Sequence, residues 1–213
     1  MNEDILRGLG LEEIILKSKN RLRAHEELTH VIENCRRCWL HKRRTRVVVW
    51  DGSPFAPIMA VGEAPGRDED LRGKPFVGRA GQLLTKIIEE AGLNRLKDFY
   101  ITNILKCRPP NNRDPLPDEI KACSPYLEIQ IKLVSPKAFL CLGRYSSFYI
   151  LGRSDNPTMK ELRGKVHPTR YGIPAVCTYH PAAALRNSRL KDLILQDILL
   201  LKGLVFGEGG GET

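Results

Sequence analysis

The chain has 213 residues, of which 42% are hydrophobic and 28% are charged, and these proportions exclude disorder as the default state. The 34 Lys and Arg residues exceed the 25 Asp and Glu residues and give a net charge of +9, which favours a polyanionic partner such as nucleic acid. The sequence has no run of roughly eighteen apolar residues and no secretory pattern at its start, so we expect an intracellular protein, cytoplasmic or nucleoid-associated, that does not bind membranes.

The hydrophobic pattern predicts an N-terminal helical segment, residues 1–32, because apolar residues recur there at loosely helical spacing from residue 11. Short apolar runs bounded by Gly or Pro predict buried strands, and the residues between 166 and 179 indicate a hairpin or paired strands around Gly172. The predicted strands are residues 58–61, 99–102 and 138–142. Amphipathic stripes predict helices at residues 81–92, 117–134 and 190–201.

Strands that alternate with helices define the expected fold class. They predict an α/β protein, a three-layer α/β/α sandwich with a mainly parallel central sheet, over residues 33–206. The Gly-rich residues 207–213 are expected to form a disordered tail.

Four of the six cysteines have a spacing that suits a metal centre. They are Cys35, Cys38, Cys107 and Cys123. The first two form a C-x2-C turn, fifteen residues separate the last two, and in a reducing compartment such thiols are metal ligands or buried groups rather than disulfides. The spacing leaves two occupants open, an iron-sulfur cluster and a structural zinc. Cys141 and Cys177 lie in apolar strands and are expected to be small buried hydrophobes.

Basic residues crowd the first cysteine pair. Six Lys and Arg residues lie within residues 36–46, together with Trp39 and His41. The ordinary explanation is a solvated surface, and the functional explanation is a surface that follows the phosphates of a duplex. In the second explanation Arg43 and Arg44 are the expected DNA contacts.

Several motifs resemble one known family. The stretch from residue 62 to residue 81 contains Gly62-Glu63-Ala64-Pro65-Gly66 and Pro75-Phe76-Val77-Gly78, and it looks like the first active-site motif of the iron-sulfur-containing family 4 uracil-DNA glycosylases. Asn103 and the segment 180–187, which begins His180-Pro181-Ala182, are similar to the later motifs of that family. The four cysteines match its cluster pattern, and the resemblance covers about residues 33 to 200. It implies the uracil-DNA glycosylase-like fold and one [4Fe-4S] cluster in preference to zinc, with no nucleotide cofactor.

The resemblance also implies a pocket for a flipped uracil base. Phe76 would stack on the base, Asn103 would hydrogen-bond its carbonyl and imide edge, and His180 would donate a hydrogen bond to O2, where negative charge grows as the glycosidic bond breaks. The ordinary roles of these residues are core packing, turn formation and capping, respectively. Glu69 resembles the residue that obstructs the methyl group of thymine.

The turn after the first predicted strand is expected to contact the base through Gly62, Glu63 and Ala64. Some relatives in the wider superfamily carry an Asp in place of Ala64 that positions the attacking water. Here Glu63, Asn103 or a main-chain carbonyl could orient that water, so the catalytic candidates are His180, Asn103 and Glu63.

The last motif is expected to contact DNA directly. Leu185 looks like the wedge that enters the duplex, and Arg186 would contact the DNA backbone nearby, although both could merely begin the final helix.

The motifs together indicate a monofunctional uracil-DNA glycosylase. It would flip uracil out of DNA and hydrolyse the N-glycosidic bond to leave an abasic site for base excision repair, acting as a monomer on uracil-containing DNA. One alternative is a non-catalytic iron-sulfur nucleic-acid-binding module. The other is a metal-dependent nuclease or nucleotide hydrolase, for which the acidic run at residues 68–70 is a poor carboxylate cluster.

Overall fold

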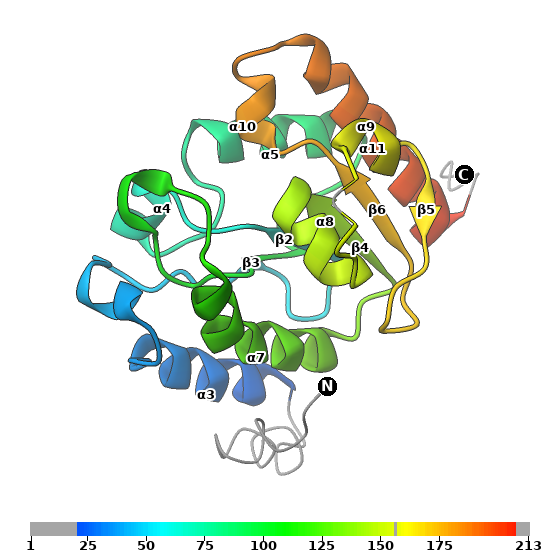
Figure 1. Ribbon diagram of the computed structural model, residues 1–213. Helices are drawn as coiled ribbons and strands as arrows, with labels where there is room; N and C mark the ends of the chain where they lie inside the picture. The colour runs from blue at the N-terminus through cyan, green and yellow to red at the C-terminus, as the bar shows by residue number, and fades with distance from the viewer. Residues whose placement is uncertain (1–20, 156, 208–213) are drawn as a thin grey trace.

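A computed structural model describes residues 21–155 and 157–207 (Figure 1). The expectations for residues 1–20 and for residues 208–213 of the tail lie outside the described residues. None of the helices in the described part of the chain is both long enough and apolar enough to cross a lipid bilayer.

The centre of the fold is one mixed sheet of six strands in the order β1-β3-β2-β4-β6-β5. The strands are β1 (Asp51–Gly52), β2 (Ile58–Gly62), β3 (Phe99–Asn103), β4 (Ala138–Leu142), β5 (Val166–His167) and β6 (Ala175–Thr178). The four central strands run parallel, while β1 and β5 pair antiparallel at the edges. The mainly parallel sheet is therefore confirmed, and so are the paired strands around Gly172.

Three helices lie where the amphipathic stripes in the sequence predict them. The α-helices are α3 (Arg21–Glu33), α4 (Arg67–Arg72), α5 (Arg79–Glu90), α6 (Arg95–Asp98), α7 (Pro117–Val134), α8 (Arg144–Leu151), α9 (Met159–Leu162), α10 (Pro181–Ala184) and α11 (Arg189–Phe206). Two short 3-10 helices are η1 (Trp39–Lys42) and η2 (Pro110–Asn112). Helices α5, α7 and α11 confirm the predictions at 81–92, 117–134 and 190–201, whereas the short helices carry too few turns to show a stripe.

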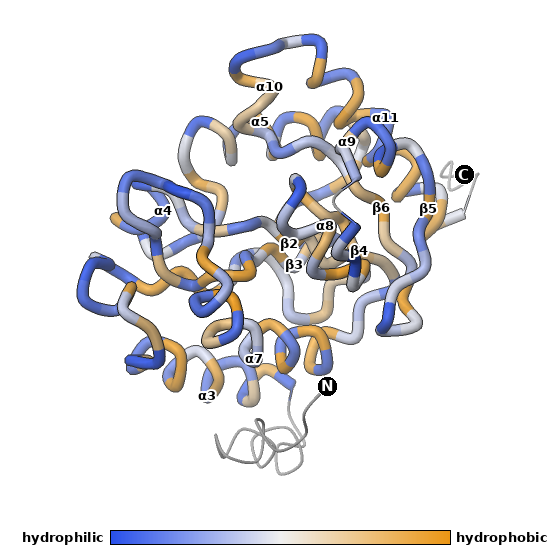
Figure 2. The backbone as a smooth tube through the Cα atoms, viewed as in Figure 1, coloured by the Kyte–Doolittle hydropathy of each residue, from blue (hydrophilic) through white to orange (hydrophobic). Residues whose placement is uncertain are grey.

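Alternation along the strands divides the core into two layers. In β2 the side chains of Ile58 and Ala60 face one layer, which α5, α10 and α11 cover, and those of Met59 and Val61 face the other. Helices α3, α7 and α8 form the second layer, and Figure 2 shows hydrophobic and hydrophilic residues alternating along α3 and α7, as in amphipathic helices. These two layers around the sheet confirm the three-layer α/β/α sandwich.

The described part of the predicted N-terminal segment belongs to the same core, because α3 packs on α7 through Ala24, Leu28 and Ile32. The domain boundaries drawn from the sequence stay a prediction.

The strand order places a binding edge beside β2. Strand β3 lies on one side of β2 and β4 on the other, so the direction of the strand order reverses there. In open parallel sheets a crevice forms outside the carboxyl ends of the strands at such a point. Gly62 ends β2 there and pairs in register with Asn103, which ends β3.

Candidate active site

A pocket of about 440 Å³ opens at the carboxyl ends of β2 and β3. Six of the residues predicted for base binding line it, namely Glu63, Ala64, Glu69, Phe76, Asn103 and His180. They come from the turn after β2, helix α4, the loop before α5, the end of β3 and the start of α10. Residues that are distant in the sequence thus meet at the binding edge of the sheet.

Gly62 lies directly under the pocket, and its lack of a side chain is required there. A Cβ atom at this position would lie 2.3 Å from Asn103 Oδ1 and 2.6 Å from Phe76 Cζ, closer than real Cβ contacts. The glycine therefore lets a carboxamide and an aromatic ring approach the end of β2 from two sides.

Asn103 presents an unsatisfied acceptor to the pocket. The residue is 2% exposed, and its Oδ1 atom is buried without a hydrogen-bond partner among the described residues. Buried polar atoms are almost always paired, so an orphaned oxygen in a pocket wall indicates a ligand that donates an N–H or O–H.

Lys106 holds the backbone of this strand end in place. Its Nζ atom donates to Asn103 O, Thr102 Oγ1 and Gln130 Oε1, each at 2.6 Å, and its side chain is buried. The Gln130 amide in turn donates to Tyr100 Oη at 2.9 Å. A satisfied buried network of this kind fixes the backbone from which the carboxamide of Asn103 extends.

His180 is a neutral hydrogen-bond donor at the opposite wall. It caps α10, and the Ala182 N–H donates to His180 Nδ1 at 3.1 Å, which leaves the ring proton on Nε2. Burial of the imidazole lowers the pKa of His180 to about 4; the negative charge of Glu69 opposes this shift and Arg186 adds to it. At neutral pH the ring can thus donate from Nε2 without carrying charge.

Phe76 forms the floor of the pocket in an unusual backbone conformation. Its φ angle is 52°, in the left-handed region, and its side chain is 6% exposed. A bulky residue in that region costs about 1–3 kcal/mol, which surrounding contacts must offset. The ring centroid lies 5.7 Å from that of His180, with an interplanar angle of 33°. The ring belongs to the core cluster and also lines the pocket, so core packing and a stacking surface coincide in one side chain.

Glu69 is fixed rather than free in the pocket wall. Its Oε1 atom accepts hydrogen bonds from Val77 N at 2.9 Å and Gly78 N at 2.8 Å. These amides lie at the start of α5, where a carboxylate is favourable. The carboxylate thereby joins α4 to the loop that carries Phe76.

Glu63 has a perturbed carboxyl group at the mouth of the turn. Burial, and after it the negative charge of nearby Asp114, raises the pKa of Glu63 to about 7, with Arg144 opposing the shift. Asp114 is held by Tyr145 Oη at 2.8 Å and by Arg144 at 3.7 Å. The carboxyl group of Glu63 therefore changes its charge near neutral pH.

The sequence interpretation missed one wall of the pocket. Pro109, Asn112 and Arg113 line it, and they belong to the loop between Cys107 and Cys123. Arg113 is held by a bidentate ion pair with Glu119, with distances of 2.6 and 2.9 Å. The positive φ of Asn112 marks a turn, but no spacing in the sequence indicates that this turn reaches the base pocket.

The four predicted metal ligands face one another across a second, small cavity. Cys35, Cys38, Cys107 and Cys123 line it together with Arg37, His41 and Arg44. Two donors reach the sulfur atoms, since Arg44 Nη1 lies 3.3 Å from Cys107 Sγ and the Lys106 amide nitrogen lies 3.3 Å from Cys123 Sγ.

This donor set fits a thiolate-ligated centre. Burial raises the pKa of Cys123 to about 12, so its thiolate requires a bound cation. The four thiols line one cavity, but within residues 21–155 and 157–207 no three His, Cys, Asp or Glu side chains are positioned to hold one metal ion. The fit therefore concerns the type of donor and not a preformed coordination geometry. The two remaining cysteines, Cys141 and Cys177, are buried partners in register on β4 and β6, as expected of core residues.

The predicted DNA contacts lie in different environments. Arg43 is exposed and its guanidinium lies 5.2 Å from the ring centroid of the exposed Trp39, a cation–π arrangement. Arg44, in contrast, donates to Cys107 and to the carbonyl of Glu33, so it also serves the cysteine cavity.

Leu185 follows α10 and is 43% exposed, and the exposed Arg186 lines the base pocket. Neither residue begins the final helix, because α11 starts at Arg189.

The fold and the pocket define an α/β protein with a ligand-sized pocket beyond the carboxyl edge of its parallel strands. Residues 49–199 match the uracil DNA glycosylase superfamily. The chain is 45% identical over 172 residues to the type-4 uracil-DNA glycosylase of Archaeoglobus fulgidus. The matched region covers 78% of this chain and 86% of that protein. The chain is also 45% identical to the enzyme of the same name from Sulfurisphaera tokodaii, over 84% of each chain. The corresponding protein of Thermotoga maritima is 41% identical, over 86% of this chain and 98% of its own.

The chain therefore belongs to the uracil-DNA glycosylase superfamily, and within it to the type-4 family. This membership confirms the resemblance drawn from the motifs.

Proposed function

We propose that this protein is a monofunctional uracil-DNA glycosylase, which flips uracil out of DNA and hydrolyses its N-glycosidic bond to leave an abasic site for base excision repair. The type-4 relatives are named uracil-DNA glycosylases, and this chain matches them over most of their length. The observation that carries the proposal is the buried, unpartnered Oδ1 atom of Asn103, which lies in a pocket between an aromatic ring and a neutral imidazole.

Asn103 supplies the base discrimination. The N3 position of uracil carries a hydrogen and donates to Oδ1, whereas N3 of cytosine is an acceptor and would face the same oxygen with a lone pair. A site built to pair with one N–H rejects an analogue that lacks it, because both buried acceptors stay unsatisfied. Glu69, which the loop amides hold at the pocket wall, obstructs the methyl group of thymine.

His180 stabilises the departing base. As the bond from C1′ to N1 breaks, its electron pair stays with uracil and negative charge develops on O2. The Nε2–H of the neutral ring donates to O2, and Phe76 stacks against the face of the base. Because the imidazole has a pKa of about 4, it acts as a hydrogen-bond donor and not as a proton source at neutral pH.

Glu63 positions the water. Its carboxylate, half-buried beside the pocket, accepts a hydrogen bond from the attacking water and faces the positive charge on the sugar. The water oxygen bonds to C1′, its proton passes to the carboxylate, and the uracil anion takes a proton on release. Of the other two candidates, Asn103 is already assigned to the base, and the carbonyls of Gly62 and Glu63 accept hydrogen bonds from the amides of Ile104 and Leu105.

Duplex DNA is held by groups around this pocket. Leu185 enters the stack that the uracil leaves, Arg186 contacts the adjacent backbone, and Arg43 with Trp39 provides a basic, aromatic surface beyond it. The protein acts as a monomer on uracil-containing DNA.

Cys35, Cys38, Cys107 and Cys123 hold one [4Fe-4S] cluster. The cluster is a structural centre that fastens the η1 segment to the loop before α7, and N–H donors from Arg44 and Lys106 to its ligand sulfurs match the hydrogen bonding that such centres use.

The proposal is tested with an end-labelled duplex that contains a single uracil opposite guanine. We expect strand cleavage after alkaline heating, no cleavage without it, and no cleavage of the matched duplex with thymine. Intact strands under conditions where the duplex is bound would contradict the proposal and favour a binding module.

A further inference from the structure

The Phe76 loop needs an external restraint, because its backbone conformation is unfavourable by itself. The φ of 52° places a bulky residue in the left-handed region, and the loop has no glycine at that position to relieve it. Gly81 underneath is equally constrained, since a Cβ there would lie 1.9 Å from Phe76 O. The contacts on either side of Phe76 therefore decide where its ring lies.

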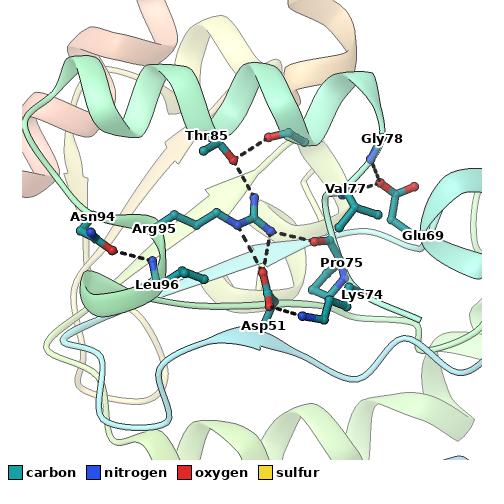
Figure 3. Close-up of polar contacts among 11 residues, drawn as sticks. Asp51, Glu69, Lys74, Pro75, Val77, Gly78, Thr85, Asn94, Arg95 and Leu96 are labelled. Carbon is teal, nitrogen blue, oxygen red and sulfur yellow. Dashed lines mark hydrogen bonds and ion pairs between the residues drawn. The ribbon is translucent and has the colours of Figure 1, made fainter. Parts of the chain in front are cut away.

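A buried guanidinium lies behind this loop (Figure 3). Arg95, at the start of α6, is 9% exposed, and its Nη2 atom donates to the carbonyl of Pro75 at 2.8 Å. The same guanidinium bonds Asp51 Oδ2 from Nε at 3.3 Å and from Nη2 at 3.1 Å, and Thr85 Oγ1 from Nη1 at 3.0 Å. Its three nitrogens thus join strand β1, helix α5 and the peptide that immediately precedes Phe76.

The opposite side of the loop is held by a different group. Glu69 accepts from the amides of Val77 and Gly78, which follow Phe76 in the chain. Arg95 in α6 thus bonds the peptide before Phe76, and Glu69 in α4 bonds the peptide after it. Between them the backbone of Phe76 keeps its left-handed conformation and its ring keeps its place over Gly62 and beside His180.

We propose that Arg95 is a positioning residue for base excision, which acts through the Pro75 carbonyl to hold the Phe76 ring where the flipped base stacks. The inference rests on the proposed function for its catalytic consequence, but not for the restraint itself. Arg95 lies behind the loop and is not a lining residue of the pocket, so its effect passes through the loop. A planar fork with donors on three nitrogens is needed, because the three partners lie around different edges of the guanidinium.

The test uses Arg95→Lys in the full-length protein. Lysine keeps the charge opposite Asp51, but one ammonium nitrogen cannot replace donors spread over a guanidinium. The matched control is Arg163→Lys. Arg163 forms a similar ion pair with buried Asp197, at 2.9 and 3.0 Å, and bonds the carbonyl of Leu193 at 3.1 Å, and it does not line the pocket.

Three quantities are compared with the wild type: amide hydrogen exchange of residues 74–78, the single-turnover excision rate and the Kd for the uracil duplex. For Arg95→Lys we expect faster exchange in that segment, excision slowed roughly tenfold to hundredfold, and an unchanged Kd. For Arg163→Lys we expect a lower melting temperature with wild-type exchange at 74–78 and a wild-type rate.

Equal slowing in both variants, or wild-type exchange and rate in Arg95→Lys, would overturn the proposal. If Arg95→Lys does not fold, the uncharged double variant Asp51→Asn with Arg95→Gln must show the same slowed excision and faster exchange, and a wild-type rate in it also overturns the proposal. A wild-type protein without excision activity would refute the proposed function, while the exchange measurement would still decide whether Arg95 holds the loop.

Discussion

Gly62 and Asn103 pair at the carboxyl ends of adjacent parallel strands, and the carboxamide of Asn103 occupies the space that a side chain at Gly62 would fill. The sheet register therefore sets the position of the base-reading oxygen, and the pocket requires a glycine at the end of β2.

Gly62→Ala is predicted to lower the excision rate at least about a hundredfold, because the new methyl group displaces both Asn103 Oδ1 and the Phe76 ring. It should also destabilise the fold by about 1–3 kcal/mol, as expected of overpacking. Single-turnover kinetics and urea unfolding measure the two effects. A stable Gly62→Ala protein with the wild-type rate would show that the two side chains do not need their present places.

Asn103→Ala is predicted to lower the excision rate by about two orders of magnitude or more, with the Kd for a uracil duplex changed less than threefold, because the lost contact is made only with the flipped base. Asn34→Ala is the matched control, since Asn34 is exposed just after α3 and its side-chain amide donates to the carbonyl of His30 in that helix. Loss of duplex affinity in Asn103→Ala equal to the loss of rate would contradict the assignment.

His180 is predicted to make stability fall in acid. Its folded pKa of about 4 lies below its ordinary value of 6.5, so between these values the unfolded chain binds more protons and the free energy of unfolding decreases as the pH falls. The contribution is at most a few kcal/mol. Buried His25 has a similarly lowered pKa, so urea unfolding from pH 7 to pH 4 is compared among wild type, His180→Gln and His25→Gln. Identical pH dependence in wild type and His180→Gln would mean that the imidazole of His180 titrates normally.

Glu63 is predicted to give the excision rate a pH dependence with a midpoint near 7. The rate should rise as the pH increases through this value, because the carboxylate that orients water is present only above its pKa. Glu63→Gln should be slower and should lose this rise. A wild-type profile that is flat from pH 6 to pH 8 would indicate that another group orients the water.

Arg43 and Arg44 are predicted to differ, although they are neighbours. Arg43→Ala should weaken duplex binding at low salt and reduce the salt slope by about 1, with the visible absorption of the purified protein unchanged. Arg44→Ala should in addition speed the loss of that absorption on treatment with an iron chelator, because it removes the donor to Cys107 Sγ. Equal rates of loss in the two variants would remove the second role of Arg44.

The sequence predicted those features that depend on local pattern. Runs such as residues 58–61 and 138–142 are apolar because both faces of a parallel strand are buried, and Asn103 and His180 were predicted to lie at or just beyond strand ends, which a common sheet edge then brings together. The structure adds the contacts that depend on distant parts of the chain. Nothing near Arg95 in the sequence indicates that it reaches Pro75.

The left-handed backbone of Phe76 could not be predicted from the sequence, because glycine or asparagine normally occupies a position with that conformation. The wall formed by Asn112 and Arg113 could not be predicted either, because no local pattern in the sequence shows that this loop folds over the pocket.

A crystal structure with free uracil tests the central claim most directly. The account predicts the base stacked on the Phe76 ring, its N3 within hydrogen-bond distance of Asn103 Oδ1 and its O2 within hydrogen-bond distance of His180 Nε2. A uracil bound elsewhere, or bound in the pocket with its N3 edge turned away from Asn103, would contradict it.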